Sequence, residues 1–216
     1  MAKYNKEYYE PLEQMMAVRH QYMSKILRDH TDQDIYNFFQ NKQVLDLGCG
    51  TGEFLNNYFE MGAQCTGIDI EKNFKLKNKK NFNLYNLDAN TFLKNCKKKF
   101  DIIFLFEFLE HLEEGAKHKL FESLIKILNK NALIFLSTLN KNLLSKYLAI
   151  DIAENILKLL PKKTHKYDLF LSPTQLQTLS QKYKLSLLNV EGLQYNPITK
   201  SVKSVSYTHL RAHETS

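Results

Sequence analysis

The sequence predicts one α/β domain built on a mostly parallel, twisted sheet with helices on both faces. Two features point to this fold class. Short, continuous apolar runs alternate with helical patterns along the chain, which is typical of parallel strands buried on both faces. A glycine-rich turn at 46–53, Asp-Leu-Gly-Cys-Gly-Thr-Gly-Glu, joins the first of these runs to a helical pattern. The 216 residues, 44% of them hydrophobic, are enough for one folded domain with a full core.

The first third of the chain predicts a helical start, a strand, a helix and a second strand. Residues 8–27 place apolar side chains at helical spacings, so one or two helices should cover the start of the domain. The first strand is predicted at 43–47 and the helix after the turn at 53–61. Gly62 stands where a helix C-cap belongs. The apolar run at 64–69 predicts the second strand.

The remainder predicts four more strands and a helix. Apolar runs at 82–87, 100–105 and 132–137 have the length and bounds of buried strands, and 185–190 is predicted as a sixth strand. Residues 120–128 carry apolar side chains on one helical face, which predicts a helix between the fourth and fifth strands.

The glycine-rich turn predicts a ligand site. Gly48, Gly50 and Gly52 let the backbone fold tightly and let a ligand touch the main chain, against the positive end of the following helix. Asp46 precedes the first glycine by two residues, and Asp69, 21 residues after Gly48, is placed to accept hydrogen bonds from a ribose. The spacing G-x-G-x-G is not the dinucleotide fingerprint. Together these residues resemble motif I and the following acidic position of the class I S-adenosylmethionine (SAM) methyltransferases, a Rossmann-like fold.

Other polar residues are predicted at the same edge of the sheet. Ligands of parallel sheets bind at the carboxyl ends of the strands, near the switch point beside the first strand. Asp88 and Glu107 follow the third and fourth predicted strands, so they should meet Asp46, Gly48 and Asp69 there.

A possible metal site follows the fourth strand. Glu107, Glu110 and His111 are spaced i, i+3 and i+4, so they share one face if the segment is helical. Two carboxylates and one imidazole suit Mg²⁺ or a similar hard cation. The alternative is a helix start whose acidic residues favour the positive helix end. The local pattern leaves both open, and the position at the rim of the sheet favours the metal.

The second half of the chain resembles a narrower family. Residues 137–142, 160–165 and 192–199 are similar, in order, to signatures of the ubiquinone-biosynthesis O-methyltransferases, and 101–112 matches that family's strand-four motif. The resemblance covers roughly 10–203. It implies an enzyme that uses SAM to methylate a hydroxyl of a polyprenylated catechol-type ring.

The resemblance also implies roles for single residues. Gly48 would touch SAM, Asp69 would bind the ribose, Phe106 would pack on the cofactor, and Arg19 would bind the methionine carboxylate. The cofactor-binding candidates are Arg19, Asp46, Gly48, Gly50, Gly52, Asp69, Asp88 and Phe106.

The metal and catalytic roles also come from the resemblance. It implies a metal triad of Glu107, Glu110 and His111, shared with the small-RNA 2′-O-methyltransferases, and His165 as a further histidine facing that site. A divalent cation that bridges both catechol oxygens would lower the hydroxyl pKa and orient the ring. The catalytic candidates are Glu107 and His111. Without a metal, His111 or His165 would act as general base. A metal-dependent 2′-O-methyltransferase of RNA ends and an inactive SAM-binding protein remain alternatives.

The sequence predicts a methyltransferase domain at 1–203 and a foreign tail at 204–216. The family would have an Asp-rich turn and a last strand after Lys203, whereas this tail changes in composition and resembles translated adaptor sequence. The final antiparallel strand is therefore predicted to be missing or replaced.

Composition and charge predict a cytoplasmic protein at the inner face of a membrane. Three cysteines without zinc or disulfide spacing indicate a reducing compartment. The net charge is +7, and an apolar segment with one polar stripe at 143–160 is followed by lysines. We expect the insertion 143–166 to bind an anionic membrane surface, where the polyprenylated phenol or quinol resides. The alternative is a lid helix. Nucleic acid is not the favoured partner.

Overall fold

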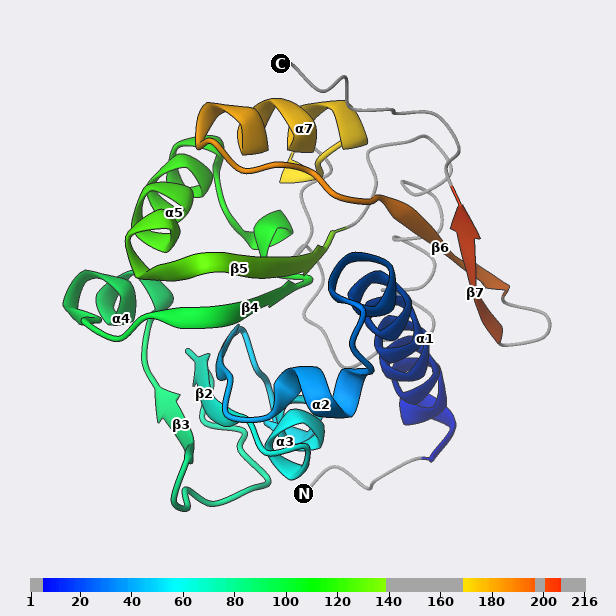
Figure 1. Cartoon of the computed structure of the whole chain (residues 1–216), viewed down its shortest axis with the longest axis vertical. Helices are drawn as coiled ribbons and strands as arrows, with labels where there is room; N and C mark the ends of the chain where they lie inside the picture. The colour runs from blue at the N-terminus through cyan, green and yellow to red at the C-terminus, as the bar shows by residue number, and fades with distance from the viewer. Residues whose placement is uncertain (1–5, 139–168, 197–200, 207–216) are drawn as a thin grey trace.

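The central element is a five-stranded parallel sheet. The computed structural model describes residues 6–138, 169–196 and 201–206. The strand order is β3-β2-β1-β4-β5, and every neighbouring pair is parallel (Figure 1). The order reverses beside β1, which makes that point the topological switch where ligands of such sheets bind. The strands are β1 (Gln43–Leu47), β2 (Gln64–Asp69), β3 (Phe82–Asn86), β4 (Phe100–Phe106) and β5 (Leu128–Ser137).

Helices cover both faces of this sheet, as the sequence predicts. The first face carries α1 (Lys6–Thr31), α2 (Ile35–Phe39) and α3 (Glu53–Glu60). The second face carries α4 (Ala89–Asn95), α5 (Glu114–Ile127) and α7 (Pro173–Lys182). Each layer buries its own hydrophobic cluster against the strands, which is the three-layer arrangement expected of a parallel sheet.

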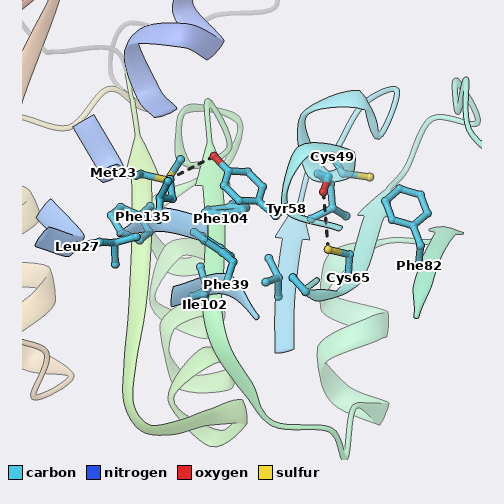
Figure 2. Packing of buried hydrophobic residues seen from close by; sticks show 14 of the residues in the cluster. Met23, Leu27, Phe39, Cys49, Tyr58, Cys65, Phe82, Ile102, Phe104 and Phe135 are labelled. Atoms are coloured by element: carbon cyan, nitrogen blue, oxygen red, sulfur yellow. Dashed lines mark hydrogen bonds between the residues drawn. The ribbon is translucent and has the colours of Figure 1, made fainter. Parts of the chain in front are cut away.

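The first core cluster fixes the position of α1 over the sheet. The Tyr58 ring of α3 packs on Phe39 and Phe104 at centroid distances of 4.5 and 5.0 Å, and its hydroxyl lies 3.9 Å from the sulfur of Met23 on α1 (Figure 2). Met23 is buried, with 1% of its surface exposed. Arg19 precedes Met23 by one helical turn, so it lies on the same face of α1 and is carried toward the sheet.

The prediction of a strand at 185–190 is wrong. This stretch forms no strand, and β6 (Glu191–Asn196) begins directly after it. Leu185 packs on the second core cluster, whereas Leu188 is 50% exposed. An apolar run becomes a strand only where another strand lies alongside to pair with it, and no described strand does so here.

The last two strands form a separate hairpin. β6 pairs antiparallel with β7 (Ser201–Ser206) in a two-stranded sheet, and β7 lies beside α1 (Figure 1). Among the described residues, no antiparallel strand joins the five-stranded sheet, which agrees with the prediction that the final strand is missing or replaced. β7 runs three residues into the predicted tail.

Several predicted segments lie outside the described residues. These are the insertion 143–166, including His165, and residues 207–216 of the tail. No helix in the described ranges is long and apolar enough to cross a membrane.

Candidate cofactor and active site

The loop between β1 and α3 has the tight conformation that its glycines predict. Gly48, Gly50 and Gly52 have φ angles of 81°, 53° and 82°, in the left-handed region that favours glycine. The Gly48 amide donates to the Ile68 carbonyl at 2.8 Å, which ties the loop to the end of β2. A Cβ on Gly48 would lie 3.0 Å from the Phe108 ring, whereas a Cβ on Gly50 would meet nothing within 4 Å. The loop therefore packs at Gly48 and is open to a ligand at Gly50.

Asp69 is fixed at the tip of β2 by two backbone amides. Its Oδ2 accepts a hydrogen bond from the Gly50 amide, and its Oδ1 accepts one from the Glu71 amide, both at 2.8 Å. The Asn86 side chain also donates to the Asp69 carbonyl oxygen at 3.2 Å. The structure thus brings together the loop and the acidic residue that the sequence places in one site.

Asp88 lies at the same edge, at the end of β3. It is the N-cap of α4, where its carboxylate accepts a hydrogen bond from the Thr91 amide at 3.0 Å. The neighbouring Leu87 amide donates to the Asp69 carbonyl at 2.9 Å. Asp88 therefore has a local capping role beside the site.

Asp46 is a buried acid behind the loop, with 4% of its surface exposed. The pKa of its carboxyl is raised to about 7, mainly by burial; the positive charge of Arg19 opposes this rise, and the negative charges of Asp69 and Glu107 add to it. Asp46 is therefore only partly ionised near neutral pH, and Arg19 is its cationic neighbour.

Arg19 reaches this site from α1. Its guanidinium lies 4.8 Å from the centroid of the Phe106 ring and forms an ion pair with Glu107. Only 12% of the Arg19 side chain is exposed. Phe106 in turn packs edge-on against Phe54 at 5.2 Å and stacks on Phe104 at 5.3 Å. The aromatic core thus supports the cation at the carboxyl edge of the sheet.

Ser137 is a site residue to which the sequence assigns no role. Its hydroxyl donates to Oε1 of Glu107 at 2.6 Å, and its carbonyl accepts from the Glu107 amide at 3.1 Å. The sequence feature that points to Ser137 is its position at the end of the predicted fifth strand, next to the end of the fourth. Ser137 and Arg19 therefore bind the same carboxylate oxygen from two different elements.

The three residues of the predicted metal triad do not share a helical face. Glu107 has a φ of 46°, so the backbone turns there, and the 3₁₀ turn η1 (Leu109–His111) begins only two residues later. The i, i+3, i+4 spacing implies a common face only if the whole segment is helical. No three His, Cys, Asp or Glu residues of the described chain lie close enough together to hold a metal ion. The described residues alone therefore do not form a metal site in this arrangement, and His165, the fourth predicted ligand, lies outside them.

Glu110 is the most buried acid of the predicted triad, with none of its surface exposed. Burial raises the pKa of its carboxyl to about 7. Within the described part of the chain, neither carboxylate oxygen has a hydrogen bond of normal geometry. The Glu110 backbone amide, the Thr138 hydroxyl and the Arg19 charge lower the pKa somewhat, and the Glu107 charge raises it. His111, in contrast, is exposed.

Comparison with known proteins identifies the relatives of this chain. Residues 18–190 match the methyltransferase-domain family. The chain is 32% identical to the ubiquinone biosynthesis O-methyltransferase of Colwellia psychrerythraea over 203 residues, which cover 90% of this chain and 82% of the relative. It is 34% identical to the protein of the same name from Pelagibacter ubique, with coverages of 93% and 85%.

Solved structures share the fold. The magnesium protoporphyrin IX methyltransferase of Synechocystis PCC 6803 with bound SAH has a TM-score of 0.60 at 15% identity, covering 91% of this chain and 84% of that one. A SAM-dependent methyltransferase from Archaeoglobus fulgidus has a TM-score of 0.58 at 24% identity, with coverages of 94% and 86%. At these identities the likeness is one of fold.

Proposed function

Because this chain belongs to the ubiquinone biosynthesis O-methyltransferases, within the methyltransferase-domain family, we propose that it transfers the methyl group of SAM to a phenolic hydroxyl. The acceptor that we propose is a polyprenylated catechol-type ring of ubiquinone biosynthesis. The relatives favour this function over RNA methylation and over an inactive SAM-binding protein.

One observation carries the proposal of a SAM site. The Gly50 amide and the carboxylate of Asp69 meet at 2.8 Å at the switch point of the sheet, and Arg19 lies at the same edge. Backbone amides at a helix start and an acid at the tip of the next strand suit a nucleoside. A guanidinium suits a carboxylate such as that of the methionine part.

Methyl transfer from sulfur to oxygen is an in-line displacement. The phenol oxygen forms a bond to the methyl carbon as the sulfur–methyl bond breaks, and the sulfur keeps that electron pair, so SAM becomes SAH. The protein must hold the two reacting atoms close and aligned. It must also accept the phenol proton, because an ordinary phenol has a pKa of about 10.

The base that we propose on this chain is His111. It is exposed on η1, directly after the segment that carries Phe106 and Glu107. Histidine is the side chain most often used to take a proton near neutral pH. Phe106 and Arg19 would hold the methionine part of the cofactor on the other side of Glu107.

A divalent cation is a separate proposal. When bound, such a cation lowers the pKa of a coordinated hydroxyl. In this arrangement Glu107 is paired with Arg19 and Glu110 is buried, so we assign no step to a metal.

The decisive experiment incubates the full chain with SAM and catechol-type quinol precursors, and follows the methylated product by mass spectrometry with and without EDTA. We expect product that depends on SAM and is lost in Asp69→Ala. Tight binding of SAM without methylation of any catechol-type ring would contradict the proposed acceptor.

A further inference from the structure

We propose that Glu107 holds Arg19 in place of the cofactor's own carboxylate and gives it up when the cofactor binds. This inference rests on the proposed use of SAM. It makes Glu107 a positioning residue that exchanges one carboxylate for another on the same guanidinium.

Arg19 is largely shielded from water and needs an anion. With 12% of its side chain exposed, it is shielded from water on one side by the Phe106 ring. Removing the partner of a buried charge is costly, because the charge is then neither solvated nor paired. Glu107 is the carboxylate that makes the ion pair with Arg19 in the described part of the chain. The guanidinium is therefore held ready, at the edge where the cofactor is expected.

Glu107 satisfies the hydrogen-bond donors of Arg19 incompletely. The ion pair runs through Nη2, while Nε is buried and has no hydrogen-bond partner within the described residues. A guanidinium binds a carboxylate best through two parallel N–H bonds. An incoming carboxylate that contacts Nε as well as an Nη nitrogen would satisfy the donor that Glu107 leaves unpaired. Because Nε is covered in this arrangement, that contact requires the Arg19 side chain to shift as Glu107 leaves.

Glu107 can release Arg19 at small cost. Its side chain is 39% exposed, so water can replace the guanidinium. Its Oε1 also accepts the Ser137 hydroxyl at 2.6 Å, and its backbone is held by the Ser137 carbonyl. The exchange therefore needs a side-chain rotation of Glu107 and no movement of β4 or β5.

The exchange has a consequence for the order of binding. Until the cofactor's carboxylate arrives, the charge of Glu107 is committed to Arg19. Afterwards the carboxylate of Glu107 is free to act on a group that binds next to the proposed base His111. Cofactor binding thus prepares the acceptor side of the site before the phenol enters.

The test compares two nucleosides by calorimetry on the full chain. SAH carries the methionine carboxylate, whereas 5′-methylthioadenosine has the same nucleoside and sulfur but lacks the carboxylate. Glu107→Gln keeps the side-chain shape and removes the competing charge. We expect it to bind SAH about three- to tenfold more tightly than the wild type, the size of a partly exposed ion pair, and to bind methylthioadenosine within twofold of the wild type.

A second variant ties the effect to Arg19. Arg19→Gln should weaken SAH by roughly tenfold or more and leave methylthioadenosine unchanged, and adding Glu107→Gln to it should have no further effect. Methylthioadenosine binding also reports that each variant is folded.

The outcomes separate this inference from the proposed function. If the wild type binds both nucleosides and Glu107→Gln binds SAH equally or less tightly, the exchange is wrong while the cofactor assignment stands. A wild-type chain that binds neither nucleoside overturns the proposed function and the exchange with it.

Discussion

Arg19 and Glu107 lie 88 residues apart in the chain and form an ion pair over the ring of Phe106. The pair joins α1 to the end of β4, and Ser137 adds the end of β5 through the same carboxylate. A cation from a helix outside the sheet therefore meets the ends of two adjacent strands of the carboxyl edge at one point. The site depends on how α1 docks as much as on the glycine-rich loop.

Adding a side chain should have different effects on SAM binding and stability at different glycines of the loop. Gly50→Ala adds a methyl group where no protein atom lies within 4 Å. We expect it to weaken SAM binding at least roughly tenfold, because the methyl fills the ligand's approach, while the left-handed φ costs only about 1 kcal/mol of stability. Calorimetry with SAM and thermal melting measure the two effects. Unchanged affinity in a folded Gly50→Ala protein would place the ligand elsewhere.

Gly48→Val serves as the comparison for that variant. Its Cβ would lie 3.0 Å from the Phe108 ring, at a φ of 81°. We expect it to abolish SAM binding and also to lower the melting temperature more than Gly50→Ala does, since a β-branched residue in this region is strained.

Asp69→Ala should weaken SAM binding by about 1–3 kcal/mol. The variant removes the acceptor for a ribose hydroxyl and also frees the Gly50 amide, which donates to Oδ2 at 2.8 Å. Glu71→Ala is a matched control, because Glu71 contributes only its backbone amide to this network. SAM affinities within twofold of each other for the two variants would contradict the ribose role.

Local sequence patterns predict the part of the site that is built from residues close together in the chain. The strand, turn and helix at 43–61 are contiguous, and Asp69 follows from the length of the next strand. Each prediction depends on the spacing of the apolar residues and on the positions of the glycines, and both can be read directly from the sequence. The position of Arg19 was inferred from family resemblance alone. In the structure it results from packing between Met23 and Tyr58, which are 35 residues apart.

The backbone at Glu107 shows why the predicted triad face did not form. The i, i+3, i+4 spacing implies a common face only within a helix. The pairing of β4 with β5 continues to Phe106 and Ser137, and the chain then turns at Glu107 with a positive φ. That pairing is set by a strand 30 residues away, as the Glu107–Ser137 bonds record, so the local pattern could not reveal it.

Chelation tests the metal proposal independently of cofactor binding. If a divalent cation is needed, EDTA should stop turnover and leave SAM affinity unchanged, and Glu107→Gln, Glu110→Gln and His111→Ala should each lose activity. The assay is run with SAM present, so that Arg19 has the alternative partner proposed above. Full turnover in EDTA would leave the general-base mechanism.

Membrane binding tests the predicted role of 143–166, which lies outside the described residues. We expect the chain to sediment with anionic liposomes at low salt, because an amphipathic segment and the lysines at 162, 163 and 166 favour such a surface, by about 1 kcal/mol for each lysine. Replacing Leu148, Ile152 and Ile156 by Ser should reduce sedimentation and spare SAM affinity. Protein that stays in the supernatant would favour the lid.

The two buried carboxyls should make stability depend on pH in one direction. Burial raises the pKa of Asp46 and of Glu110 to about 7, whereas an unfolded carboxyl ionises near pH 4. Between about pH 4 and 7 the folded chain therefore binds more protons at these groups than the unfolded chain does. Their contribution to the stability of the folded chain is fully present below pH 4 and is lost as the pH rises through 7.

Asp46→Asn should remove one part of this dependence. Arg19, Asp69 and Glu107 are the charges that act on Asp46 from α1, β2 and the end of β4. Because each unit of pKa difference is worth about 1.4 kcal/mol, the variant should gain more stability relative to the wild type at pH 8, where Asp46 is ionised in both the folded and the unfolded chain, than at pH 5. Chemical denaturation at the two pH values measures the difference, with Glu110→Gln as the second variant. An equal difference at pH 5 and pH 8 would mean that Asp46 is already ionised throughout this range, and that Arg19 compensates its burial fully.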